Sequence, residues 1–123
     1  MKKLGMGVAL LLSASLANAA DLSRKDQCTA HYITMTGLMG ILGDKDSPAA
    51  PEDRENFNKV GNAFAERLLS VAGVEQYEDI PQPVTAMGIG ALKAIADDPK
   101  TAMEALRVNI AACDKELGLV PIM

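Results

Sequence analysis

The sequence predicts an all-α protein: an up-down-up-down four-helix bundle stapled by one disulfide, after removal of an N-terminal signal peptide. In four segments, apolar residues recur at spacings of three and four, and no segment shows the alternation of a strand. Short connections that contain proline or glycine separate these segments, which favours antiparallel neighbours. The two cysteines lie near opposite ends of the first and last segments, and an antiparallel bundle brings those two positions together.

Residues 1–19 have the features of a signal peptide. Lys2 and Lys3 precede an apolar run from Leu4 to Leu12, and Ala17-Asn18-Ala19 fits an A-x-A cleavage site. The run is too short to cross the ~30 Å of hydrocarbon in a bilayer. We therefore expect cleavage after Ala19 and export to the periplasm or the medium. Residues 20–123 are expected to form a single helical-bundle domain without a membrane span.

The first helix is expected to begin near Asp21 or Ser23, whose side chains can accept hydrogen bonds from its opening turn. Its apolar stripe consists of Cys28, His31, Tyr32, Met35, Leu38, Met39 and Leu42. Gly43 is expected to end it in the left-handed conformation that glycine adopts at little cost. A polar loop with two prolines, Asp44 to Pro51, follows.

The second helix is expected from about Glu52 to Ala72, with Gly73 as its end. Its apolar stripe consists of Phe57, Val60, Phe64, Leu68 and Val71. Two closely spaced prolines exclude a regular helix between Val74 and Pro83. We expect this connection to turn Tyr77 and Ile80 inward.

The third helix is expected from about Pro83 to Ala96, with its apolar positions at Val84, Met87, Ala91 and Ile95. Asp98-Pro99 predicts the start of the fourth helix, with a capping aspartate before a proline at the first helical position. The apolar positions of the fourth helix are Met103, Leu106, Ile110, Cys113 and Leu117, and Gly118 is expected to end it.

Cys28 and Cys113 are expected to form the disulfide. Both fall on apolar stripes, and they lie at the same end of neighbouring helices in the predicted bundle. Export would place them in an oxidising compartment, where paired thiols oxidise. Two buried free thiols are the alternative. A redox-active pair is disfavoured because the chain has no C-x-x-C motif.

Composition and motifs argue against nucleic-acid binding and against catalysis. The net charge of −4 becomes about −6 once Lys2 and Lys3 leave with the signal peptide, whereas nucleic-acid binding needs a basic face. His31 is the single histidine, and no G-x-S-x-G, H-E-x-x-H, C-x-x-C-H or phosphate-binding glycine loop occurs. We therefore expect no enzyme and no cofactor.

One group of residues allows a metal-binding alternative. His31, Met35 and Met39 follow one another at i, i+4 and i+8 on one side of the first helix. An imidazole with two thioethers could ligate Cu(I). The simpler interpretation places all three in the apolar core, where methionine fills space. A haem ligated by His31 is less favoured, because the last helix offers Ile110 and Cys113 where a second ligand would be needed.

The other side of the first helix lacks charge, which predicts a contact surface. No formally charged residue, His31 aside, occurs from Gln27 through Gly43. A helix side facing water normally carries Lys and Glu. The uncharged side consists of Ala30, Ile33, Gly37, Gly40 and Ile41. It is interpreted as a homodimer seam or a docking site for another exported protein, and deeper burial within the bundle is the alternative.

Together these features predict an exported, non-enzymatic helical protein that acts by binding another protein, as an inhibitor, an immunity protein or a chaperone-like protein would. The alternative is a small-ligand carrier that binds copper or haem through His31 and the methionines.

Overall fold

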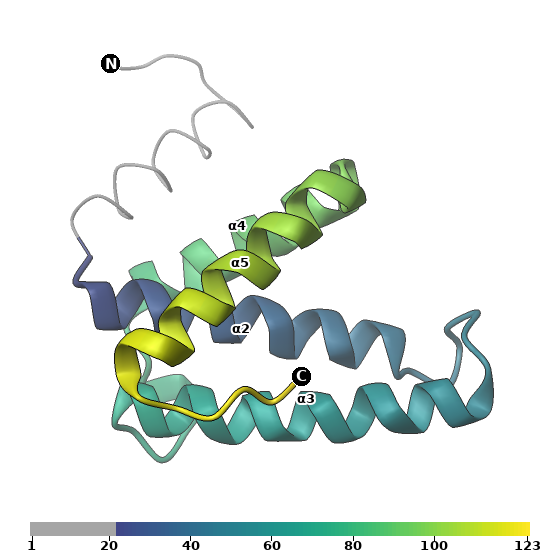
Figure 1. Cartoon of the computed structure of the whole chain (residues 1–123), viewed down its shortest axis with the longest axis horizontal. Helices are drawn as coiled ribbons and strands as arrows, with labels where there is room; N and C mark the ends of the chain where they lie inside the picture. The colour runs from purple at the N-terminus through teal and green to yellow at the C-terminus, as the bar shows by residue number, and fades with distance from the viewer. Residues whose placement is uncertain (1–21) are drawn as a thin grey trace.

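The computed structural model describes residues 22–123 (Figure 1). This part of the chain folds into four α-helices and one 3₁₀ turn: α2 (Arg24–Leu42), α3 (Pro51–Ala72), η1 (Tyr77–Asp79), α4 (Gln82–Asp97) and α5 (Pro99–Leu117). The prediction of a bundle of four helices in contact is confirmed. The predicted signal peptide and its cleavage site lie outside the described residues. None of the helices among residues 22–123 combines the length and hydrophobicity of a membrane span.

Helix α2 is the centre of the structure. It lies side by side with α3 and also contacts α4 and α5, which cross this pair obliquely (Figure 1). Backbone contacts of α3 with α4 and α5 are sparse by comparison. In a simple up-down-up-down bundle the first and third helices would lie diagonally apart. Here they touch directly, so α2 is covered on more sides than the sequence predicted.

A close approach between α2 and α4 explains this difference. Gly88 of α4 is buried, and a Cβ atom built on it would lie 2.7 Å from Cγ2 of Ile33 and 3.1 Å from the carbonyl oxygen of Ala30. The Thr34 hydroxyl donates to the carbonyl oxygen of Gly88 at 2.8 Å. Only a residue without a side chain fits at this crossing, so Gly88 is what allows α4 to lie against α2.

The antiparallel contact between α2 and α3 also depends on a small residue. A Cβ built on Gly61 would lie 3.1 Å from the Cβ of Met39. Nearer the start of α2, the rings of Tyr32 and Phe64 are 6.2 Å apart between centroids. Burial of these side chains between the two helices removes apolar area from water, which is the main favourable term in folding.

The helix starts agree with the predictions within one or two residues. The Ser23 side chain accepts from the backbone N–H of Asp26 at 3.1 Å, as expected of an N-cap. Pro51 and Pro99 each begin a helix. Asp98 occupies the predicted cap position, but its side chain makes no cap hydrogen bond. Instead, its backbone N–H closes the end of α4 by donating to Ala94 O at 2.9 Å.

The helix ends follow two different mechanisms. Gly73 and Gly118 end α3 and α5, as predicted, and they do so in the left-handed conformation, with φ of 75° and 69°. Gly43 ends α2 with φ of −89°, so the prediction of a left-handed conformation is wrong for this residue. Gly43 is buried instead, and its carbonyl oxygen accepts from Nδ2 of Asn58 on α3 at 3.0 Å. Glycine is suited to this position because α3 lies so close.

Of the two residues in the α3–α4 connection that were predicted to point inward, only one does. Ile80 is buried in the core, whereas Tyr77 is 52% exposed. Ile80 leaves the 3₁₀ turn in an extended conformation, with φ of −73° and ψ of 131°. It therefore does not share the orientation of Tyr77, which stays on the outer side of the turn.

Candidate functional site

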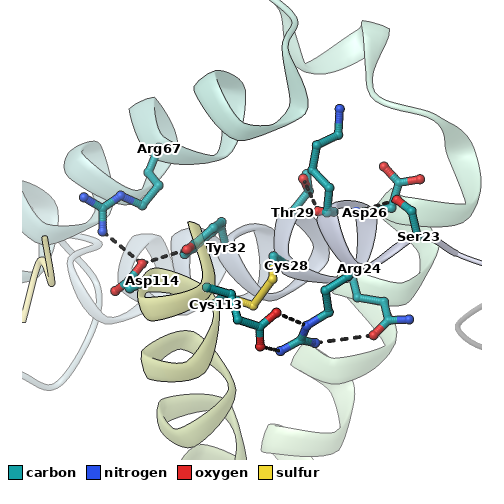
Figure 2. The surroundings of a disulfide bond; sticks show 12 residues. Ser23, Arg24, Asp26, Cys28, Thr29, Tyr32, Arg67, Cys113 and Asp114 are labelled. Carbon is teal, nitrogen blue, oxygen red and sulfur yellow. Dashed lines mark hydrogen bonds and ion pairs between the residues drawn. A yellow bond between two sulfur atoms is a disulfide. The ribbon is translucent and has the colours of Figure 1, made fainter. Parts of the chain in front are cut away.

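The predicted disulfide is present and lies in the core. Cys28 of α2 and Cys113 of α5 are bonded, their Cα atoms are 5.6 Å apart, and both side chains are fully buried (Figure 2). The bond joins residues 85 positions apart in the sequence. It fixes the last turns of α5 against the first turns of α2. The side chains at that end of α5 are therefore held in place.

A buried polar cluster lies beside the disulfide, formed by Tyr32, Arg67 and Asp114 from three different helices (Figure 2). The Tyr32 hydroxyl donates to Oδ1 of Asp114 at 2.7 Å, and Nη1 of Arg67 donates to the same oxygen at 3.0 Å. The Asp114 residue is only 3% exposed. A buried carboxylate requires such partners, because water no longer solvates it. The cluster thus ties α2, α3 and α5 together.

Burial and the neighbouring Asp114 carboxylate both raise the pKa of Tyr32, burial being the larger cause. The phenol is therefore held as a hydrogen-bond donor to Asp114. Because Asp114 accepts from both Tyr32 and Arg67, its charge is compensated within the core. The arrangement points to a structural role for this carboxylate.

Sequence reasoning missed this cluster. The available signal was a charged residue immediately next to an apolar stripe: Asp114 follows Cys113, and Arg67 precedes Leu68. On a helix such a neighbour sits at the margin of the buried side, where a long or paired side chain can reach inward.

An ion pair lies beside the disulfide. Nε and Nη2 of Arg24 each lie 2.8 Å from a different carboxylate oxygen of Glu116 (Figure 2). This two-point contact lowers the pKa of Glu116, chiefly through the hydrogen bonds from Arg24, and raises the pKa of Arg24. Both side chains remain about half exposed, so salt screens the pair.

A hollow of about 610 Å³ lies between α5, α3 and the C-terminal segment that follows α5. Figure 1 shows this segment turning back from the end of α5 along α3. We name the hollow the α5 groove. Its lining residues are Phe64, Arg107, Val108, Ile110, Ala111, Asp114, Lys115, Leu119, Pro121, Ile122 and Met123. The buried part of this lining, which we call the floor, consists of Phe64, Ile110 and Asp114.

The entrance of the α5 groove has apolar side chains that water reaches. Val108 is 57% exposed and Met123 is 61% exposed. Large apolar side chains beside an apolar hollow form the kind of exposed patch that marks binding surfaces. The groove was not predicted, because residues 119–123 have no periodic pattern that reveals where they pack.

The charges of the α5 groove are unevenly distributed. Its one acidic lining residue, Asp114, is paired with Arg67. Arg107 and Lys115 also line the groove, and both side chains are exposed. The lining therefore combines two buried apolar residues, Phe64 and Ile110, with two exposed basic side chains, on a chain whose overall charge is −4.

The three residues considered for copper lie along α2, but the methionines are part of the core. Met35 and Met39 are buried, and Met39 packs against Gly61 of α3. His31 is half-buried, and burial, followed by the positive charge of Arg24, lowers its pKa. Core packing accounts for the methionine positions. A copper or haem site at His31 stays a prediction.

The uncharged side of α2 is largely covered by α4, in agreement with the alternative interpretation of burial within the bundle. Ala30 is buried, Ile33 packs against Gly88, and a Cβ on Gly37 would lie 3.1 Å from Cδ2 of Leu92. Only Gly40 and Ile41 of the five predicted residues are exposed. A homodimer or partner surface on this side stays a prediction, now confined to those two residues.

Compared with family models, curated proteins and solved structures, the chain matches none of them.

Proposed function

We propose that this is an exported, non-enzymatic protein that acts by binding another exported protein. Its contact surface is the rim of the α5 groove, the exposed apolar side chains of Val108 and Met123 at its entrance. The observation that carries this proposal is the exposure of Val108 and Met123 at the entrance of an apolar hollow. Aliphatic and thioether side chains in this position favour a partner that covers them with an apolar side chain of its own.

The rigidity of the groove supports a binding role. The disulfide and the Tyr32–Asp114–Arg67 contacts hold the end of α5 that forms one wall. A preformed surface loses less conformational entropy when it binds. The disulfide also supports export, because such bonds persist in oxidising compartments.

The use of the charged groups supports a non-enzymatic role. The most buried carboxylate, Asp114, has both a tyrosine and an arginine as partners, so it is committed to the fold. His31 is half-buried on the central helix, outside the lining of the α5 groove.

The test compares two aspartate variants of an affinity-tagged chain expressed in its own host. Val108→Asp places a charge at the groove entrance, whereas Ile89→Asp places the same charge on α4, outside the groove, at a residue that is 47% exposed. We expect the wild type and Ile89→Asp to co-purify with the same dominant exported protein, and Val108→Asp to lose it. Equal recovery by both variants would place the contact elsewhere.

A further inference from the structure

We propose that the α5 groove also binds a single-chain amphiphilic carboxylate, such as a free fatty acid of medium chain length. Its chain would lie over Phe64 and beside Val108, and its carboxylate would pair with Lys115. This proposal rests on the proposed function only in using the same groove: the amphiphile fills the hollow, whereas a protein partner covers the rim.

The size and lining of the groove fit an apolar chain. Its volume of about 610 Å³ falls within the ~300–1,000 Å³ of typical small-molecule sites. Phe64 and Ile110 lie beneath the groove and are 0% and 5% exposed, and the accessible apolar surface comes mainly from Val108 and Met123 at the entrance. A flexible chain that lay along this surface would remove apolar area of both the groove and the ligand from water.

The charges select a negative headgroup. Arg107 and Lys115 are eight residues apart on α5, so they lie about 12 Å apart along the helix axis. Nη2 of Arg107 is 3.4 Å from Oε1 of Glu104, and this carboxylate compensates part of the positive charge of Arg107. Lys115 has no ion-pair partner among residues 22–123, so its ammonium group is available to a ligand.

The acidic group in the lining does not oppose this choice. Oδ1 of Asp114 accepts from both Tyr32 and Arg67, and the guanidinium compensates its negative charge. A cationic amphiphile would meet the positive side chains of Arg107 and Lys115, whereas the one acidic side chain in the lining, Asp114, is paired with Arg67. Charge complementarity therefore favours the anion over a cation with the same chain.

The first experiment compares headgroups. Calorimetric titrations of the exported protein use dodecanoate and dodecyltrimethylammonium, both below their micelle-forming concentrations. We expect saturable one-to-one binding of dodecanoate and at least about tenfold weaker binding of the cation, because the headgroup meets charge of the same sign. Equal affinity for the two probes, or no saturable binding of dodecanoate, overturns the proposal.

The second experiment locates the ligand with paired variants. Lys115→Gln is expected to weaken dodecanoate binding by about threefold or more, whereas Lys100→Gln, on the same helix but outside the groove, leaves it unchanged. Val108→Asp is expected to abolish detectable binding, and Ile89→Asp to preserve it. Equal effects within either pair overturn the proposed site.

The two proposals fail separately. If Val108→Asp loses the protein partner but dodecanoate never binds to the wild type, the ligand proposal is wrong and the proposed function stands. If dodecanoate binds as expected but the partner is retained by Val108→Asp, the groove is a ligand site only. Circular dichroism of each variant shows that the helices are intact before either result is used.

Discussion

Replacement of Asp114 by alanine tests whether the buried cluster holds the three helices together. The change removes the acceptor shared by Tyr32 and Arg67, whose donor atoms lie 2.7 Å and 3.0 Å from Oδ1. It leaves a fully buried tyrosine hydroxyl without this partner, and a guanidinium whose side chain is 17% exposed without its counter-ion. A buried donor without an acceptor loses its hydration and gains nothing in return.

The expected cost follows from these contacts. An unsatisfied buried hydroxyl costs about 1–3 kcal/mol, and breaking a buried ion pair costs about 3–5 kcal/mol in total. Because Arg67 retains some access to water, we place the loss from Asp114→Ala at about 3–4 kcal/mol. Small domains are stable by about 5–15 kcal/mol, so the variant is expected to fold, with reduced stability.

Urea unfolding followed by circular dichroism measures this loss, with Asp97→Ala as the matched control. Asp97 is exposed at the end of α4, and its replacement is expected to change the free energy of unfolding by less than about 0.5 kcal/mol. Asp114→Asn keeps an oxygen acceptor but no charge, and should fall between the two. A loss below about 1 kcal/mol for Asp114→Ala would refute the role given to the cluster.

Three further predictions concern the disulfide, the helix crossing and the response to pH. The Cys28→Ala/Cys113→Ala double variant should lose about 4–5 kcal/mol in urea unfolding, because the bond closes a loop of 85 residues; a loss below about 1 kcal/mol would contradict this. Gly88→Ala should destabilise by about 1–3 kcal/mol because its Cβ would meet α2, whereas Gly40→Ala, with open space around it, should stabilise by up to about 1 kcal/mol; equal effects on the thermal midpoint would argue against the close crossing. Burial lowers the pKa of His31 below its ordinary value of 6.5, so the unfolded chain binds more protons there than the folded protein. The contribution of neutral His31 to the free energy of unfolding is therefore fully present above about pH 6.5 and is lost as the pH falls toward the lowered pKa. His31→Gln should reduce the difference in the free energy of unfolding between about pH 7.5 and about pH 5. An unchanged difference would refute the lowered pKa of His31.

The helices were predictable because they depend on local patterns, and the disulfide was predictable because it also depends on the order of the helices. Phe64 and Leu68, for example, are four residues apart, which already places them on one buried side of a helix. The pairing of Cys28 with Cys113 followed from their positions near the ends of two antiparallel helices. Such inferences need only the period of a helix and the order of the segments.

The packing of α4 on α2 was not predictable from the pattern alone. The sequence showed that one side of the first helix lacks charge and contains small residues, but it did not say which element covers that side. A partner outside the chain was expected, whereas Gly88 brings α4 onto Ile33. Gly37 was a signal for close approach, and burial within the bundle, the alternative interpretation, accounts for Ala30, Ile33 and Gly37. A partner at Gly40 and Ile41 stays a prediction.

The α5 groove and its buried charges depend on contacts between distant segments. The lining combines Phe64 with residues 119–123, which follow the last helix and have no periodic pattern. Asp114 is buried because Tyr32 and Arg67 reach it from two other helices. A single charged residue in a helical segment is usually solvated, so its position in the core emerges only from the three-dimensional packing.

The central claim is that the rim of the α5 groove contacts another protein. Site-specific photo-cross-linking tests it most directly, with a benzophenone amino acid placed at Val108 or at Ile89 in the chain expressed in its own host. We predict a discrete adduct with one exported protein from position 108 and no such adduct from position 89, although both side chains are exposed. The same adduct from position 89 but not 108, or no adduct from position 108, would contradict the claim.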